Sequence, residues 1–191
     1  MPFKRMVSIA AAVMLVAVLA SGEALAAPKK VYLVNGLFSK AFGYGLTNLS
    51  KKIPYARHFK FSGSVSQAAI NGIIKDATNA YNNDPSTQIS LVGISQGANA
   101  VASIAAQLAR NGVKVHYLAA IEGGNMAAVQ DNVNKADSFI CSNSGCSRRK
   151  LHRAGGNSST RMGTLELDTG HIDSGNHPNM HSRVISQIFS A

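Results

Sequence analysis

Tryptophan is absent from the 191 residues, and aromatic side chains make up only 6% of them. Proteins that bind single-stranded nucleic acids commonly stack the bases on aromatic rings. The net charge of +10 would attract a polyanion, but so few aromatic side chains make nucleic acid a poor candidate partner. The one clear basic cluster, residues 148–153, has the composition of a solvated loop. The positive charge fits an anionic envelope surface or an acidic substrate better.

Long apolar runs are absent after residue 20. The one such run, residues 6–20, follows Lys4 and Arg5 and leads into the small-residue stretch 24–26. This order is typical of a secretory signal peptide. A transmembrane anchor is the alternative, but the run is shorter than the roughly 20 residues that a bilayer requires. We therefore expect a signal peptide at 1–26, a mature chain at 27–191 without a transmembrane segment, and a periplasmic or secreted protein.

Cysteine is also scarce, which excludes a small scaffold held together by several disulfides. The only two cysteines, Cys141 and Cys146, flank a flexible polar turn, and no cysteine follows the N-terminal apolar run as a lipoprotein would require. In an oxidising compartment this spacing predicts a disulfide. A zinc site is the competing interpretation, but a second pair of ligands is not evident. We expect neither a metal nor a cofactor.

The chain instead contains apolar strand-like runs that alternate with helix-like segments. We predict strands at 30–34, 57–61, 88–94 and 113–121, and helices at 46–53, 66–81 and 96–110. Such alternation is typical of a parallel sheet covered by helices on both faces. The fold class predicted is therefore α/β, a three-layer α/β/α sandwich around a mostly parallel sheet, folded as a single domain.

The pattern is weaker after residue 122. It indicates a helix around 126–134, short strands at 138–140 and 164–167, and a final helix after Pro178. The polar stretch 142–162 shows no apolar period. No internal repeat or low-complexity linker interrupts the chain.

One motif stands between a predicted strand and a predicted helix. Residues 93–97 read Gly-Ile-Ser-Gln-Gly and match the pattern G-x-S-x-G. In this setting the serine occupies a sharp turn at the tip of the sheet, where its hydroxyl is exposed as a nucleophile. The two glycines have a steric reason, because the turn brings strand and helix close together. The sequence therefore favours Ser95 as a nucleophile over an accidental turn.

A serine nucleophile requires a histidine base, which a carboxylate orients. In this architecture the order along the chain is nucleophile, acid, histidine, so only His171, His177 and His181 qualify. His171 is favoured because it follows the last predicted strand, whereas the other two suit capping or packing roles. The histidines at 58, 116 and 152 are assigned no role.

The preferred acid is Glu122, at the carboxyl end of the strand that follows the motif. Active-site groups collect at that end of parallel strands. Asp137, Asp168 and Asp173 are the alternatives. For the oxyanion hole we expect one backbone N–H from Gln96 and one from the loop after the first strand, near Leu37.

Three stretches, 31–37, 91–98 and 171–173, resemble a group of small exported bacterial α/β-hydrolase-fold proteins of the lipase or esterase type. The resemblance implies a compact hydrolase core without a large cap domain, and it supports Ser95 with His171. The sequence departs from the family pattern in two places. Glu122 stands where such proteins tend to have aspartate, and Ile94 stands where histidine is common before the serine.

These observations predict an exported serine hydrolase that cleaves a small ester, a thioester or a lipid-like substrate through Ser95, His171 and Glu122. A non-catalytic envelope binding protein that retains the fold is the first alternative, because a fold does not fix a function. A metal site built from His171, Asp173, His177 and His181 is a weaker one. Pro178 weakens it, because His177 then precedes the last helix instead of lying on it.

Overall fold

The computed structural model describes residues 27–42, 45–143 and 145–190. The predicted signal peptide at 1–26 lies outside these residues. Within the described part of the chain, no helix combines the length and the apolar character needed to cross a bilayer.

Six strands form one sheet in which every neighbouring pair is parallel. Their order across the sheet is β2-β1-β3-β4-β5-β6. The strands are β1 (Lys29–Val34), β2 (Arg57–Phe59), β3 (Gln88–Ile94), β4 (Val115–Ile121), β5 (Val133–Cys141) and β6 (Arg161–Leu167). From β1 the chain first adds β2 on one side and then continues through β3 to β6 on the other. The order therefore reverses between β1 and β3, and ligands of open α/β sheets bind at the carboxyl ends of the strands beside such a reversal.

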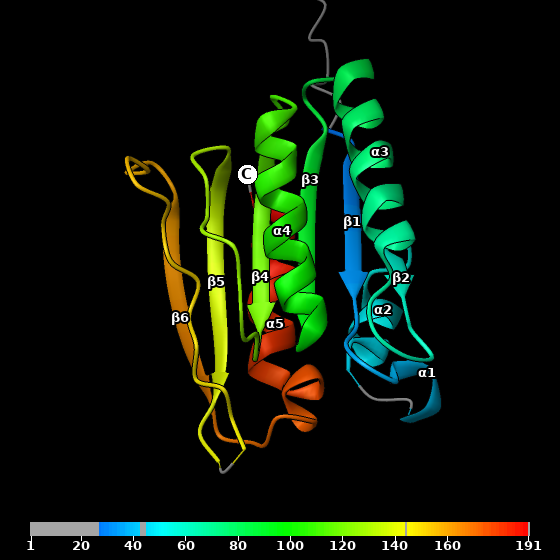
Figure 1. Cartoon of the computed structure of the whole chain (residues 1–191), viewed down its shortest axis with the longest axis vertical. Coiled ribbons are helices and arrows are strands. Elements are labelled where there is room, and N and C mark those ends of the chain that lie inside the picture. The colour runs from blue at the N-terminus through cyan, green and yellow to red at the C-terminus, as the bar shows by residue number, and fades with distance from the viewer. Residues whose placement is uncertain (1–26, 43–44, 144, 191) are drawn as a thin grey trace, which may run out of the picture.

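Helices cover both faces of the sheet, as Figure 1 shows. On one face α3 (Gln67–Asn83) and α4 (Gln96–Arg110) pack against inward-facing strand residues such as Tyr32 and Val34. On the other face α2 (Thr47–Lys52) and α5 (Pro178–Phe189) pack against the alternate residues, including Val31 and Leu33. Because successive strand residues point to opposite faces, two cores form. The predicted α/β/α sandwich is confirmed.

Local capping and side-chain size explain the two long helices on the first face. The hydroxyl of Ser66 accepts a hydrogen bond from the backbone N–H of Ala69 at 3.3 Å, which caps the start of α3. In α4, alanines occupy four of the eight buried positions. Their small side chains let this helix lie close to the sheet, so its first turn comes directly against the ends of β1 and β3.

The helix predicted around residues 126–134 is wrong. Met126, Val129 and Val133 have helical spacing, but the backbone of Val129 instead bridges to Arg153. Its N–H donates to the carbonyl of His152 at 2.8 Å, and Val133 begins β5. Backbone pairing with a segment over twenty residues away thus replaces the local helical hydrogen bonds.

The late strands are longer than predicted, and two short helices were not predicted. β5 and β6 extend the expected strands at 138–140 and 164–167 toward their amino ends. The one-turn helix α1 (Ser39–Phe42) lies in a glycine-rich stretch, and the 3-10 helix η1 (Asp173–Asn176) lies just before α5. No large insertion interrupts the described part of the sandwich.

Candidate active site

Ser95 occupies the turn between β3 and α4. Its backbone has φ 57° and ψ −124°, a conformation that a residue with a side chain rarely adopts. The backbone N–H of Ser95 donates to the carbonyl of Ile121 at 2.9 Å, which ties the turn to the end of β4. This is the strained geometry that a nucleophile elbow requires.

The two glycines of the motif permit this turn because no Cβ atom fits at either position. A Cβ on Gly93 would lie 2.2 Å from the carbonyl oxygen of Gly97, and a Cβ on Gly97 would lie 2.0 Å from the carbonyl oxygen of Val34. Both distances are far shorter than a van der Waals contact, and the opposing atoms belong to the backbone. The amino end of α4 is therefore pressed against the ends of β1 and β3.

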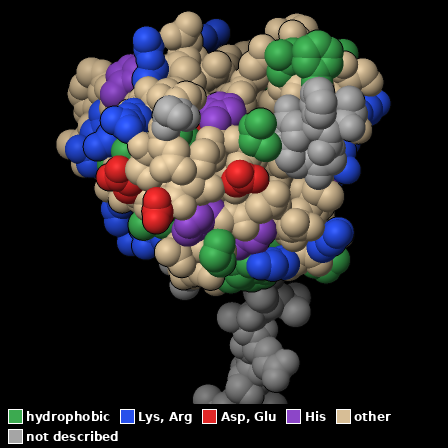
Figure 2. All heavy atoms as spheres, turned by 90° about the horizontal axis from the view of Figure 1, so that it is seen from below, with side chains coloured by type: hydrophobic (Ala, Val, Ile, Leu, Met, Phe, Trp, Pro, Cys, Tyr) green, Lys and Arg blue, Asp and Glu red, His purple; other side chains and the backbone are tan. Residues whose placement is uncertain are grey.

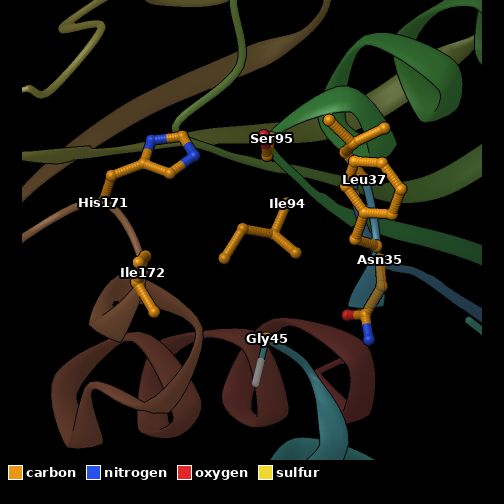
Figure 3. A pocket seen from close by; sticks show the side chains of 9 residues that line it. Asn35, Leu37, Gly45, Ile94, Ser95, His171 and Ile172 are labelled. Atoms are coloured by element: carbon orange, nitrogen blue, oxygen red, sulfur yellow. The ribbon is translucent and has the colours of Figure 1, made fainter. Parts of the chain in front are cut away.

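His171 reaches the same place from the loop between β6 and η1. Figure 3 shows its imidazole ring directed toward Ser95 across a pocket that both residues line. The Nδ1 atom lies 3.4 Å from Oε2 of Glu122. About a third of the His171 side chain is exposed, at 35%, whereas the Glu122 side chain is fully buried. The structure thus brings together the three residues that the sequence analysis singled out.

Glu122 directly follows β4 and has a positive φ of 50°. Two backbone N–H groups hold its carboxylate. Cys141 donates to Oε1 and Ser147 donates to Oε2, each at 2.7 Å. A buried carboxylate is costly unless hydrogen bonds compensate for lost hydration, and these two donors provide that compensation.

The pocket has a volume of about 210 Å³ and a mainly apolar lining. Ser95 and His171 are accompanied by carbon-rich side chains, among them Leu37 and Ile94. Phe38 and Ile172 also line it and are unusually exposed for large apolar residues, at 46% and 56%. Apolar surface that remains open beside polar groups suits a small ligand with a hydrocarbon part.

The two residues expected to supply oxyanion donors lie beside Ser95. Gln96 is the first residue of α4, and the first N–H groups of a helix have no partner within the helix. Leu37 lines the pocket in the loop after β1. Gly36, just before it, is so close that an added Cβ would lie 2.9 Å from the Cβ of Ser95.

The alternative acids have other positions. Asp137 is buried within β5, where it accepts hydrogen bonds from Tyr117 at 3.0 Å and from Arg183 at 2.8 Å. Burial, followed by the nearby Asp137 charge, raises the pKa of Tyr117. The hydrogen bond to Asp137 raises the pKa of Arg183. Asp168 and Asp173 are exposed on the surface.

The remaining candidate histidines have packing or capping roles. His177 caps α5, where its ring accepts from the N–H of Asn179 at 3.2 Å. His181 is buried, and its ring nitrogens lie 2.9 Å from the carbonyl of Gly175 and 3.1 Å from the ammonium of Lys52. Burial lowers the pKa of His181. It also lowers the pKa of His58, to about 4.

Cys141 and Cys146 form the predicted disulfide, with their Cα atoms 5.6 Å apart. It closes a short loop at the end of β5, next to Glu122. No local pattern indicates that the bridge and the acid are neighbours, because Glu122 and Cys141 are 19 residues apart along the chain.

Two residues of the site, Asn35 and Ser147, were not predicted from the sequence. Asn35 is fully buried and lines the pocket, and its side-chain oxygen accepts from the N–H of Leu46 at 2.8 Å. Ser147 holds Glu122 through its backbone, which leaves no trace in the sequence. The position of Asn35 at the carboxyl end of a predicted strand was the one available signal for it.

Comparisons with known proteins agree with the fold. No protein-family model and no curated protein matches the chain by sequence. Among solved structures, a protein described as a YdeN-like hydrolase of Pectobacterium atrosepticum superposes with a TM-score of 0.54 at 14% identity. That match covers 84% of this chain and 91% of the other. The chain has the α/β-hydrolase fold.

Two thioesterases have the same fold. The thioesterase domain SrfTE, which cyclises the lipopeptide surfactin, has a TM-score of 0.54 at 11% identity, covering 86% of this chain and 93% of its own. Human thioesterase 2 has a TM-score of 0.53 at 9% identity, covering 85% and 96%.

We predict that Gly97→Ala destabilises the protein by about 3 kcal/mol or more, because the added methyl group overlaps backbone atoms that cannot move aside. Gly72→Ala is the matched control. Gly72 is exposed within α3 and has no atom within 4 Å of an added Cβ, so the same change should raise stability by about 0.5–1 kcal/mol. Urea unfolding measures both. Equal effects of the two substitutions would contradict the close packing of the turn.

Proposed function

We propose that this protein is a serine hydrolase that cleaves an ester or a thioester. The observation that carries the proposal is the strained turn at Ser95, which faces His171 across a pocket. On the far side of the imidazole, Nδ1 of His171 lies 3.4 Å from Oε2 of the buried Glu122. Nucleophile, base and acid in this arrangement are the requirements of acyl transfer by a serine triad.

In the proposed reaction, Oγ of Ser95 attacks the substrate carbonyl carbon while His171 takes the hydroxyl proton. Collapse of the tetrahedral intermediate breaks the bond to the leaving alcohol or thiol, which receives that proton from His171. Water then attacks the acyl-enzyme, again with His171 as base, and releases the acid and the free serine. Glu122 orients the imidazole through Nδ1 and stabilises its charged form.

The negative charge on the tetrahedral intermediate needs donors that are already in position. We assign these to the backbone N–H groups of Gln96 and Leu37. The proposal is supported by the place of Gln96 at the start of α4, where the helix dipole also favours negative charge. Leu37 is supported by the close approach of its loop to Ser95.

The pocket favours a small or lipid-like acyl group. Its volume of about 210 Å³ is below the size of typical drug-sized sites, and its lining is mostly apolar. Phe38 and Ile172 extend apolar surface outward. A substrate could therefore place a short hydrocarbon part beside Ser95 and keep its polar part in solvent.

We also propose that the protein is exported. The N-terminal sequence supports this, and so does the disulfide, because disulfides persist mainly in oxidising compartments.

Figure 2 views the end of the molecule to which the strands point and shows basic side chains around its rim. A hollow of about 790 Å³ beside α4 is lined in part by Arg149, Lys150 and His152. These charges fit an anionic surface or an acidic substrate.

We predict that Ser95→Ala lowers kcat/KM for a short-chain nitrophenyl ester by about 10⁴-fold or more, because the nucleophile is lost. Ser103→Ala, in the same helix, is the matched control and should retain activity. If the Ser95 variant hydrolyses the ester as fast as the parent, the protein is not a serine hydrolase, and the non-catalytic binding protein becomes the better hypothesis.

Glu122→Gln should lower kcat/KM by about 10³- to 10⁴-fold, since an amide cannot stabilise the charged imidazole and can favour the wrong tautomer. Asp168→Asn removes an exposed carboxylate near His171 in sequence and should change the rate less than twofold. The comparison is made by steady-state kinetics on the same ester. A larger loss in the Asp168 variant would move the acid role away from Glu122.

A further inference from the structure

The disulfide lies against the buried acid. Cys141 is the last residue of β5, and its N–H donates to Oε1 of Glu122 at 2.7 Å. Ser147 directly follows Cys146, and its N–H donates to Oε2 at 2.7 Å. Among the described residues, the two backbone donors to the carboxylate are thus a bridged cysteine and the residue that follows its partner.

The two donors differ in what holds them. Cys141 belongs to β5 and is paired with Leu167 of β6, so the sheet fixes its backbone. Ser147 lies in a polar stretch without helix or strand. Its hydroxyl donates to the carbonyl of Gly123 at 2.7 Å. The location of its backbone also depends on the preceding residue, Cys146, which the disulfide keeps beside Cys141.

Loss of the Ser147 donor would directly affect the contact between Glu122 and the His171 imidazole. Oε2 of Glu122 is the atom that Ser147 contacts, and it is also the atom nearest to Nδ1 of His171. The side chain has no exposure to water that could replace a lost hydrogen bond. A buried carboxylate with one fewer donor is harder to keep charged and in place.

The same loop also forms hydrogen bonds with the segment that leads to His171. The backbone N–H of Ser142 donates to the carbonyl of Leu167 at 3.0 Å, and that of Asn143 donates to the carbonyl of Thr169 at 3.4 Å. Residues on both sides of the acid–base contact therefore depend on the bridged loop. Because this loop is short, its closure adds little to the stability of the whole fold compared with a long-range bridge.

We propose that the Cys141–Cys146 disulfide is a positioning element of the site: it holds the Ser147 N–H on Glu122, keeps the carboxylate against His171, and makes hydrolysis depend on the oxidised state. This inference rests on the proposed hydrolase function. Reduction by a dithiol would transfer two electrons and two protons to the bridge, break the S–S bond and leave two thiols, while the dithiol becomes a disulfide.

The test compares kcat/KM for a nitrophenyl ester in the oxidised and dithiol-reduced protein, in the parent and in Glu122→Gln. The chain has only two cysteines, so a count of two free thiols verifies reduction. Reduction should lower kcat/KM of the parent about tenfold, the effect of losing one hydrogen bond to a charged group. It should lower that of Glu122→Gln less than twofold, because the carboxylate that the bridge positions is replaced there by an amide that cannot stabilise the charged imidazole.

The double variant Cys141→Ser/Cys146→Ser is the control for the reagent. It should match the reduced parent and be insensitive to dithiol. Circular dichroism should show the folded state in every sample. An unchanged kcat/KM after verified reduction, or the same fold-loss in the parent and in Glu122→Gln, would overturn the inference, since a merely structural bridge affects both alike.

A second measurement separates this inference from the hydrolase proposal. If the oxidised protein shows no turnover that depends on Ser95, the proposed function fails. The contact between Glu122 and His171 can then still be followed by NMR, through the chemical shift of the proton on Nδ1 of His171. A downfield signal should be present in the oxidised protein, absent in Glu122→Gln and lost on reduction. A signal that persists unchanged after reduction would overturn the positioning role.

Discussion

The architecture of the site depends on one close backbone approach. The amino end of α4 lies against the ends of β1 and β3 at a distance that leaves no room for a Cβ on Gly93 or Gly97. This approach forces the chain into a sharp turn, and Ser95 takes the unfavourable backbone conformation that results. The favourable packing of the alanine-rich face of α4 on the sheet offsets that local strain.

The sheet order determines what the turn faces. The strand order reverses between β1 and β3, and the pocket beside Ser95 lies at this reversal, lined in part by the loop after β1. β4 delivers Glu122 at the same edge, and the loop after β6 delivers His171. A buried carboxylate there is tolerable because two backbone donors accompany it. The chemistry we propose follows from groups that the fold brings to one edge.

The sequence predicted those parts of the structure that depend on neighbouring residues. The alternation of apolar runs predicted the sandwich, and the spacing of Gly93, Ser95 and Gly97 predicted the turn. The helix expected at 126–134 is wrong because Val129 pairs with Arg153, a contact that no local pattern reveals. The roles of Asn35 and Ser147 depend on hydrogen bonds between residues that are not neighbours in the sequence. In both bonds the donor is a backbone N–H, that of Leu46 and that of Ser147 itself, and any residue type other than proline can provide such a donor.

A covalent label can show whether Ser95 is an activated nucleophile. The protein is treated with a fluorophosphonate probe, which reacts with an activated serine without presuming a substrate, and its mass and modified peptide are determined. We predict one adduct per chain, located on Ser95 and prevented by His171→Ala. No adduct on the folded, oxidised protein, or an adduct on another residue, would contradict the account.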